Sequence, residues 1–235
     1  YDVGLHGQPV IFCIDRAGIT GDDGASHHGV LDLMLLSKVP GMTMFAPSSY
    51  QELQVMLDEA VAIVTGPNPG PVSIRWSKTA APHVGPDEVG SGLKGRRVRS
   101  GGDLCIIAVG KMLEAAREAA DRLEAEGVST TVWDPRCVKP LDPEMLADAA
   151  RHRFVLTAED GVREGGIGSA VADQLAELTL GASEVPRVRI LGTPMAFIPH
   201  GKPDRILADV GLDCAGLTAA ALSLVHAAAT DTAHL

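Results

Sequence analysis

The sequence predicts an α/β protein with mainly parallel sheets flanked by helices, and three observations support this class. Short apolar runs alternate with helical patterns along most of the 235 residues, which is the order that βαβ units require. Several runs are continuously apolar, as strands buried on both faces of a parallel sheet are. The apolar fraction of 46% is that of a globular protein, so a mainly disordered chain is excluded.

The first half offers about three strands and one long helix. The predicted strands lie at 9–15, 42–46 and 72–76, and the first of them should be buried on both faces. A helix is predicted over 49–64, where Ser49 and Glu52 have capping-box spacing. Its apolar face is formed by Leu53, Met56, Leu57, Ala60, Val61 and Val64. Because a parallel strand this near the first residue needs neighbours joined by crossovers, we expect a truncated first domain.

The second half has a regular βαβ pattern. Residues 77–101 are polar, Gly-rich and without periodicity, so we place a linker at 81–101 between domains 1–80 and 102–235. The strands predicted beyond it are 104–109, 130–133, 154–157 and 188–191. The helices predicted there are 112–126, one that starts at Asp142-Pro143, 168–180 and 215–229.

Composition limits the classes of partner. With 20 Lys and Arg against 30 Asp and Glu, the formal net charge is −10, which argues against a nucleic-acid-binding protein. Four widely spaced cysteines without a CxxC pair predict buried, reduced thiols. We find no signal peptide and no apolar stretch near the roughly 18–20 residues that span a bilayer. These features predict a cytoplasmic protein that does not enter a membrane.

The loop over 15–29 is the densest functional candidate. It follows the carboxyl end of a predicted strand, where open parallel sheets bind ligands. Its four glycines permit unusual backbone angles, and its acids, arginine and histidines offer charge neutralisation and proton transfer. A metal site at Asp22, Asp23, His27 and His28 is less favoured, because adjacent histidines diverge and no further cluster completes it. A solvated turn without function is the remaining alternative.

Three other segments carry weaker indications. The Gly-rich segment 161–168 lies between a strand and a helix, and is better explained as a tight turn with close helix packing than as a phosphate cradle. Arg75 and Lys78 follow a strand end, where Arg75 pairs with an acid or binds an anion. His200, in a loop, is interpreted as structural.

A family resemblance becomes specific at the loop. The pattern reads Asp15-Arg16-Ala17-Gly18-x-x-Gly21-x-Asp23-Gly24-x-x-His27-x-Gly29, with Asp32-Leu33 after it, and resembles the signature of the 1-deoxy-D-xylulose-5-phosphate synthase family. The similarity continues through Asp134-Pro135-Arg136, Val138-Lys139-Pro140-Leu141, Glu159-Asp160, Gly165-Gly166-x-Gly168-Ser169 and Phe197-Ile198-Pro199-x-Gly201. It covers nearly the whole chain in one register. The implied fold is a truncated pyrimidine-binding domain followed by a transketolase C-terminal-like domain.

The resemblance also implies a reaction. Members condense pyruvate with glyceraldehyde 3-phosphate, with loss of CO2, on thiamine diphosphate and Mg²⁺, as homodimers that supply isoprenoid, thiamine and pyridoxal precursors. By position, His27 matches a histidine that hydrogen-bonds the reacting oxygens, and Asp23 a substrate-site carboxylate. Arg16 matches a cation that holds the acceptor phosphate, and Lys78 stands where many members carry a second arginine. The main cofactor-binding residues are expected upstream of Tyr1, no metal ligand is assigned, and the chain alone is predicted to be inactive.

Two other hypotheses stay open. One is a different enzyme of the same fold group, such as a transketolase or the β subunit of a 2-oxo-acid dehydrogenase. The other is a non-catalytic dimerisation or binding module. The retained Arg16, Asp23 and His27 weigh against the second.

Overall fold

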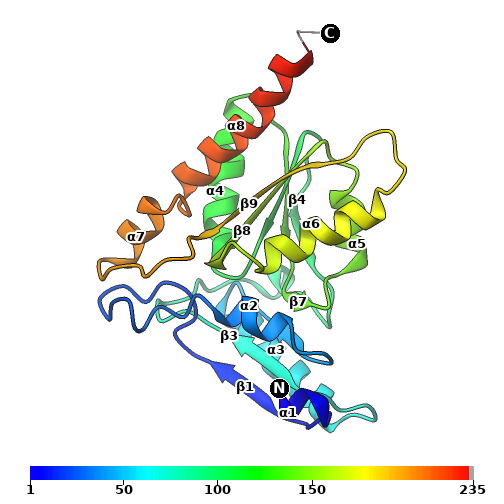
Figure 1. Ribbon diagram of the computed structural model, residues 1–235, viewed down its shortest axis with the longest axis vertical. Coiled ribbons are helices and arrows are strands. Elements are labelled where there is room, and N and C mark those ends of the chain that lie inside the picture. The colour runs from blue at the N-terminus through cyan, green and yellow to red at the C-terminus, as the bar shows by residue number, and fades with distance from the viewer. Residues whose placement is uncertain (233–235) are drawn as a thin grey trace.

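Two mainly parallel sheets lie one above the other in the computed structural model, which describes residues 1–232 (Figure 1). The elements of the first half are α1 (Asp2–Leu5), β1 (Ile11–Ile14), α2 (Asp32–Ser37), β2 (Thr43–Phe45), α3 (Tyr50–Thr65) and β3 (Val72–Arg75). Those of the second half are a short 3₁₀ helix η1 (Pro86–Glu88), β4 (Arg96–Arg99), β5 (Leu104–Ala108), α4 (Met112–Ala125), β6 (Thr130–Asp134), β7 (Cys137–Lys139), α5 (Pro143–Ala149), β8 (Phe154–Val162), α6 (Ile167–Leu178), β9 (Arg187–Thr193), α7 (Pro203–Asp209) and α8 (Cys214–Thr232). The predicted α/β class is confirmed.

The second sheet has helices on both faces. Its strand order is β4-β6-β5-β8-β9, and all of its pairings are parallel except that of β4 with β6. Alternate residues of the central strand β5 enter different cores, as the pleat requires. Leu104 and Ile106 belong to the core that contains α4 and α8, whereas Cys105 and Ile107 belong to the core that contains α5 and α6. Figure 1 shows α4 and α8 together on one side of this sheet and α5 and α6 on the other.

The first sheet is shared between the two halves of the chain. Its order is β1-β3-β2-β7, in which β7 from the second half pairs antiparallel with β2. Lys139 on β7 donates from Nζ to the carbonyls of Ser37 and Val39, at 2.7 and 2.6 Å. The halves are therefore joined by a strand as well as by side-chain packing.

The edge position of β1 corrects one prediction. Among residues 1–232, β1 pairs only with β3 and is not buried along its length, so the expected burial on both faces is wrong. Cys13 on this strand is exposed, whereas Cys105, Cys137 and Cys214 are buried, and all four are free thiols. The buried-thiol prediction therefore holds for three cysteines and fails for Cys13, because a strand with one neighbour leaves part of its surface uncovered.

The long helix α3 begins as predicted but buries a different stripe. Ser49 caps it by accepting a hydrogen bond from the Glu52 amide at 3.1 Å. Its buried residues are Glu52, Met56 and Ala60, while Leu57 and Val61 are exposed. Glu52 lies in this stripe because its carboxylate pairs with a buried arginine of the second half, which the helical period alone cannot reveal.

Two further expectations change. The aperiodic 81–101 stretch contains β4, which pairs antiparallel with β6 at the edge of the second sheet. The stretch Pro203–Ala227, which contains α7 and most of α8, is long and apolar enough to cross a membrane by length and composition, contrary to the sequence expectation. In the fold, however, α8 lies along α4 and buries Leu217 and Ala221 in the main core, as a core helix does. The domain limits themselves stay a prediction.

Candidate functional site

The loop that follows β1 is closed at its neck by backbone hydrogen bonds. Gly18 and Gly29 exchange both of theirs, at 2.8 and 2.9 Å. Between them the loop turns back at Gly21 and Gly24, both at positive φ, where glycine is the residue best tolerated. Arg16 at the entrance to the loop has a φ of 56°, a conformation that non-glycine residues rarely adopt. The segment 18–29 is therefore a closed loop, and its glycines adopt the unusual backbone angles that the sequence predicted.

Four predicted site residues lie on and beside this loop. Lys78, just after β3, donates from Nζ to Asp23 Oδ2 at 2.7 Å. That hydrogen bond is the largest cause that lowers the pKa of Asp23, and the charges of Lys78, Arg16 and His27 lower it further. His27 is exposed and lies within hydrogen-bond distance of Ser26, with 3.0 Å between Nδ1 and Oγ. The fold thus brings one carboxylate and two cations together, with His27 close enough to act on the same carboxylate.

The second half of the chain supports the loop at several points. Asp160 on β8 fills the space beside Gly18, where a Cβ would overlap its carboxylate. Pro203 and the carbonyl of Gly201 lie against Gly21, and the Gly201 amide donates to the Gly21 carbonyl at 3.3 Å. The segment 199–203 therefore runs beside the site loop. Sequence reasoning left its His200 as structural and could not show that this segment reaches the loop.

Arg75 pairs with acids, which was one of the two alternatives for it. Its Nε donates to Asp32 Oδ2 at 2.7 Å and its NH1 to Asp160 Oδ1 at 2.6 Å. All three side chains are at most 9% exposed. Burial alone would lower the Arg75 pKa, but the charges of Asp160 and Asp32 outweigh it and raise that pKa. This triad joins β3, α2 and β8 below the site loop and keeps Arg75 positively charged.

The Gly-rich turn before α6 is filled by the protein's own carboxylate. Glu159 accepts hydrogen bonds from the amides of Gly168 at 2.8 Å and Ile167 at 3.1 Å. A Cβ on Gly166 or Gly168 would collide with the surrounding atoms. Burial raises the Glu159 pKa to about 7 although both amides favour its charged form. The tight turn is confirmed, and the amides that a phosphate cradle would use are occupied.

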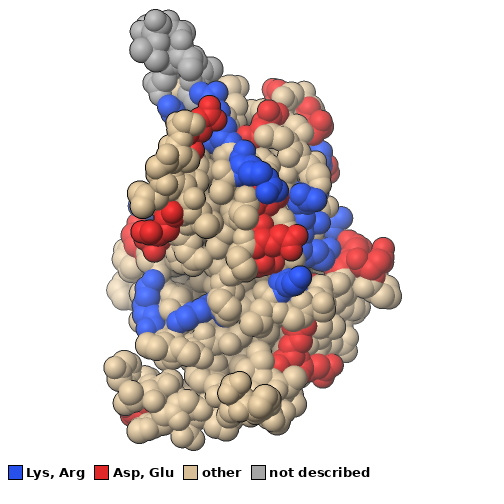
Figure 2. Space-filling model, turned by 90° about the vertical axis from the view of Figure 1, so that its right-hand side faces the viewer, with Lys and Arg blue, Asp and Glu red and all other residues tan. Residues whose placement is uncertain are grey.

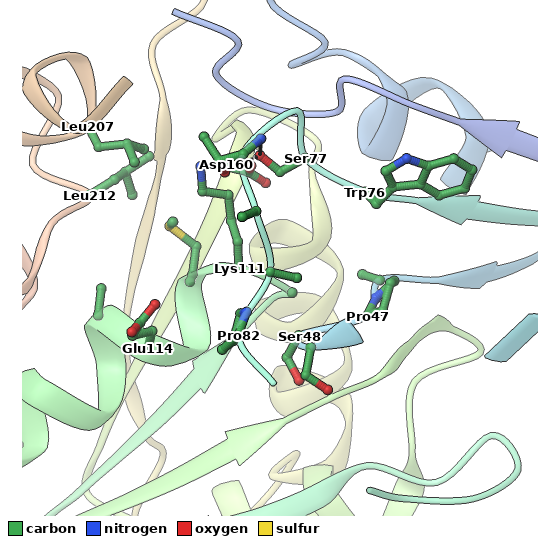
Figure 3. A pocket seen from close by; sticks show the side chains of 18 of the residues that line it. Pro47, Ser48, Trp76, Ser77, Pro82, Lys111, Glu114, Asp160, Leu207 and Leu212 are labelled. Carbon is green, nitrogen blue, oxygen red and sulfur yellow. Dashed lines mark hydrogen bonds between the residues drawn. The ribbon is translucent and has the colours of Figure 1, made fainter. Parts of the chain in front are cut away.

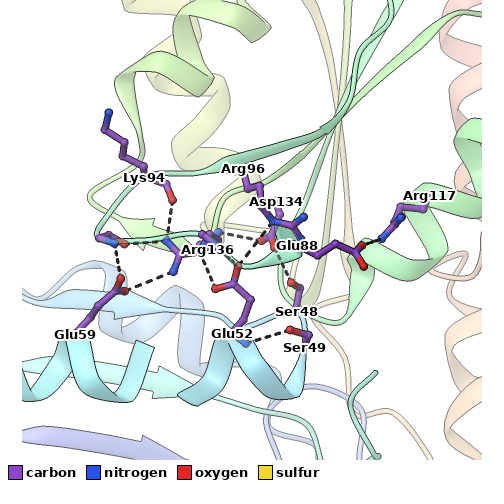
Figure 4. A network of polar contacts seen from close by, with 12 residues as sticks. Ser48, Ser49, Glu52, Glu59, Glu88, Lys94, Arg96, Arg117, Asp134 and Arg136 are labelled. Carbon is purple, nitrogen blue, oxygen red and sulfur yellow. Dashed lines mark hydrogen bonds and ion pairs between the residues drawn. The ribbon is translucent and has the colours of Figure 1, made fainter. Parts of the chain in front are cut away.

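A second buried network holds α3 to the second half (Figure 4). Arg136, fully buried, donates from Nε to Glu52 Oε2 at 2.7 Å and from NH1 to the carbonyls of Gly92 and Lys94. Asp134 accepts from Ser48 Oγ at 2.6 Å, and its burial raises its pKa to about 6 despite that bond. Sequence reasoning found the Asp134-Pro135-Arg136 motif but gave it no role, and its role in the fold is to connect the halves.

A cavity of about 670 Å³ opens beside the site loop, where the carboxyl ends of strands from both sheets meet. It is lined by residues that follow β2, β3 and β5 and by Asp160 of β8, with α7 and α8 on its other side. Figure 3 shows Lys111, at the start of α4, pointing into it. Arg75 and Ser77 line this cavity, but Arg16, Asp23, His27 and Lys78 do not. The predicted site residues therefore lie outside the cavity, on the adjoining loop or, for Lys78, just after β3 beside it.

Potential ligands for a metal and its diphosphate are scattered or already bonded among the described residues. Among them, no group of three or more His, Cys, Asp and Glu side chains could hold a metal ion. Asp23 is paired with Lys78, and the amides at the start of α6 are taken by Glu159. Residues 1–232 therefore do not by themselves form a metal site, and Asp23 and the amides at the start of α6 are not available to a diphosphate.

Two family models match the chain. Transketolase, pyrimidine binding domain, covers residues 1–83, and Transketolase, C-terminal domain, covers residues 93–217. The chain belongs to the transketolase family. The pyrimidine-binding match contains the site loop and β1 to β3, and the C-terminal match contains the second sheet and β7. In this transketolase-family chain both buried networks therefore run from one matched domain to the other.

Two curated proteins that share one enzyme name are similar to this chain over most of its length. The chain is 45% identical over 221 residues to 1-deoxy-D-xylulose-5-phosphate synthase of Thermobifida fusca, covering 92% of this chain and 33% of that protein. It is 43% identical over 236 residues to 1-deoxy-D-xylulose-5-phosphate synthase 1 of Streptomyces coelicolor, covering 97% of this chain and 34% of that protein. The chain therefore spans about a third of the length of the curated relatives it matches.

Solved structures agree in fold. A split-gene transketolase, described as an inactive β4 tetramer, superimposes with a TM-score of 0.78 at 32% identity, over 92% of this chain and 67% of that one. A transketolase mutant from Pichia stipitis gives a TM-score of 0.73 at 18% identity, over 95% of this chain and 31% of that one, which shows the fold alone. Transketolase-family enzymes use thiamine diphosphate, so this chain's relatives are transferases of that type.

Proposed function

We propose that the chain is the C-terminal portion of a 1-deoxy-D-xylulose-5-phosphate synthase, which joins pyruvate to glyceraldehyde 3-phosphate with loss of CO2. The observation that carries this is the site loop, which groups Arg16, Asp23, His27 and Lys78 in a chain 45% identical to such a synthase. Thiamine diphosphate and Mg²⁺ would be held mainly by residues other than those described. The complete enzyme would be a cytoplasmic homodimer.

Each site residue has a physical task in this proposal. Arg16 and Lys78 provide positive charge at the loop for the phosphate of the acceptor substrate. Lys78 is already paired with Asp23, so the carboxylate fixes where that ammonium stands. His27 is exposed on the loop, where its imidazole can hydrogen-bond the reacting oxygens and move a proton.

The partners are small molecules in this proposal. On the face shown in Figure 2, acidic and basic side chains lie intermixed, and the net charge is −10. An anionic substrate is therefore attracted by the local cations of the loop rather than by the field of the whole protein.

A chimera tests the reaction. The segment of the Thermobifida fusca synthase that precedes the matched region is joined to this chain and assayed with labelled pyruvate, glyceraldehyde 3-phosphate, thiamine diphosphate and Mg²⁺. We expect label in a ketose phosphate. His27→Ala should lower kcat by about 10²- to 10⁴-fold, whereas His6→Ala, on the exposed α1 end, should not.

Two results would contradict these expectations. A chimera that folds, binds the cofactor and forms no ketose phosphate would contradict the proposal. The 235-residue chain alone should show no turnover in the same mixture, and turnover by it would overturn that expectation.

One observation favours a second candidate. The split-gene transketolase that superimposes on this chain is described as inactive in its β4 form, so the chain is alternatively a subunit of a split enzyme of this family. Formation of a ketose phosphate from a ketose donor, without CO2 release from pyruvate, would support this candidate over the synthase.

A further inference from the structure

The two adjacent histidines of the site loop have different surroundings. His27 is exposed, and among the described residues its ring makes one hydrogen-bond contact, with the neighbouring Ser26. His28 is half-buried and reaches two separate segments of the chain. Its Nδ1 lies 3.1 Å from the Thr20 amide nitrogen and 3.3 Å from Thr20 Oγ1, and its Nε2 lies 3.3 Å from the Pro199 carbonyl oxygen.

These partners fix the position of the proton on the His28 ring. A backbone N–H can only donate, so Nδ1 must accept from Thr20 and cannot carry a hydrogen. A carbonyl can only accept, so Nε2 must carry the hydrogen that it donates to Pro199. His28 is therefore the neutral Nε2–H tautomer, with both ring nitrogens engaged and neither free for proton transfer to a substrate.

The contacts of His28 join two structures that belong to different halves. Thr20 lies just inside the neck closed by Gly18 and Gly29, so one side of the ring ties the neck together. Pro199 lies in the segment that runs beside the loop, so the other side of the ring ties the loop to the second half. Between Thr20 and His28 the chain makes the turns at Gly21 and Gly24 and carries the site residues, and the His27 amide donates to the Gly24 carbonyl at 3.0 Å.

We propose that His28 is a positioning residue, which holds the loop neck against the Pro199 carbonyl and so fixes where Asp23 and His27 stand. The proposal rests on the proposed function for the statement that the loop is a substrate site. It differs from a catalytic assignment, because His28 acts through the loop and does not touch the reacting atoms. It also gives the two adjacent histidines different tasks. Both ring nitrogens of His28 are bonded within the protein, whereas the His27 ring is exposed and contacts Ser26.

The first measurement uses the unmodified 235-residue chain, labelled with ¹⁵N. Long-range ¹H–¹⁵N correlation spectra at neutral pH identify which nitrogen of each imidazole carries the hydrogen. We expect His28 to be the Nε2–H tautomer, without the averaging of two tautomers that an unconstrained ring shows. A His28 ring that exchanges between tautomers, or that carries its hydrogen on Nδ1, would overturn the proposal without any mutation.

The second measurement compares variants by amide hydrogen exchange and by the His27 ring resonances. In His28→Ala, the Thr20 amide should exchange about tenfold faster, which corresponds to about 1.4 kcal/mol, and the His27 resonances should shift. In His28→Gln, whose amide can both accept and donate, the exchange rate of the Thr20 amide should stay within about threefold of that in the unmodified chain. The His27 ring resonances should stay close to their positions in the unmodified chain. Ser26→Ala is the matched control, because it removes the contact to His27 but leaves the Thr20 amide bonded.

The outcomes separate a positioning role from a general effect on folding. Rescue by His28→Gln with an unchanged melting temperature supports the proposal. Equal exchange of the Thr20 amide in His28→Ala and in the unmodified chain would refute it, as would unchanged His27 resonances in His28→Ala. No turnover is measured, so a negative result leaves the synthase proposal intact, and an inactive chimera leaves this proposal intact.

Discussion

Replacing Arg75 by methionine removes the only cation of a buried triad and leaves the carboxylates of Asp32 and Asp160 without it. Arg75 is 6% exposed and bonds to both acids at 2.7 and 2.6 Å. Breaking a buried pair on one side costs about 3–5 kcal/mol, because a charge stays desolvated and uncompensated. For a chain of this size each kcal/mol lowers Tm by roughly 2–4 °C, so Arg75→Met should lower it by about 6–20 °C.

The control is an exposed pair of the same type. Arg205 Nε bonds to Asp209 at 2.9 Å, with both side chains more than half exposed, so Arg205→Ala should change stability by at most about 0.5 kcal/mol. Combining Arg75→Met with Asp32→Asn and Asp160→Asn should recover much of the loss, since no unpaired charge remains. Circular dichroism melts at neutral pH measure all of these. A Tm of Arg75→Met equal to that of Arg205→Ala would refute the reasoning.

Three further predictions concern other residues. Burial raises the Glu159 pKa from 4.5 to about 7, so the fold disfavours its charged form. The free energy of unfolding should therefore fall by about 2 kcal/mol as pH rises from 5 to 8. Urea melts at several pH values measure this fall, and Glu159→Gln should remove it. Lys78→Met should let the Asp23 pKa rise toward its ordinary value, as followed by ¹³C NMR of the carboxyl group. An unchanged pKa would contradict the ion pair between Lys78 and Asp23. Cys13 should react with a thiol reagent in the native chain, while the three buried cysteines react only in denaturant. Rapid labelling of all four would contradict the burial of the other three, and protection of Cys13 would contradict the exposure of β1.

Local patterns were sufficient for the regular elements. Each long apolar run became a strand and each long helical pattern a helix, because the burial of one face follows directly from the spacing of apolar residues. Several short elements were missed, among them β7 with three residues and α2 with six, which are too short to show a period. A loop does follow β1 as expected, since its glycines and polar residues come after the end of a strand, and its role as a site stays a prediction.

The partners of the polar residues could not be obtained in this way. Glu52 was read as half of a capping box, yet its carboxylate bonds to Arg136, which lies 84 positions away in the sequence. Asp160 and Pro199 lie still farther from the loop that they contact, at Gly18 and His28. Neither a helical nor a strand period carries information about such distant pairs.

The order of the long strands and helices, the presence of a loop after the first strand and the likeness to a family were all contained in the sequence, because they depend on neighbouring residues and on their spacing. Only the tertiary structure decided that β1 is an edge strand, that β7 pairs into the first sheet and that Arg75 forms ion pairs with two acids. The physical reason is that burial, ion pairing and imidazole tautomers are set by which distant segments meet, and that is a property of the packed chain.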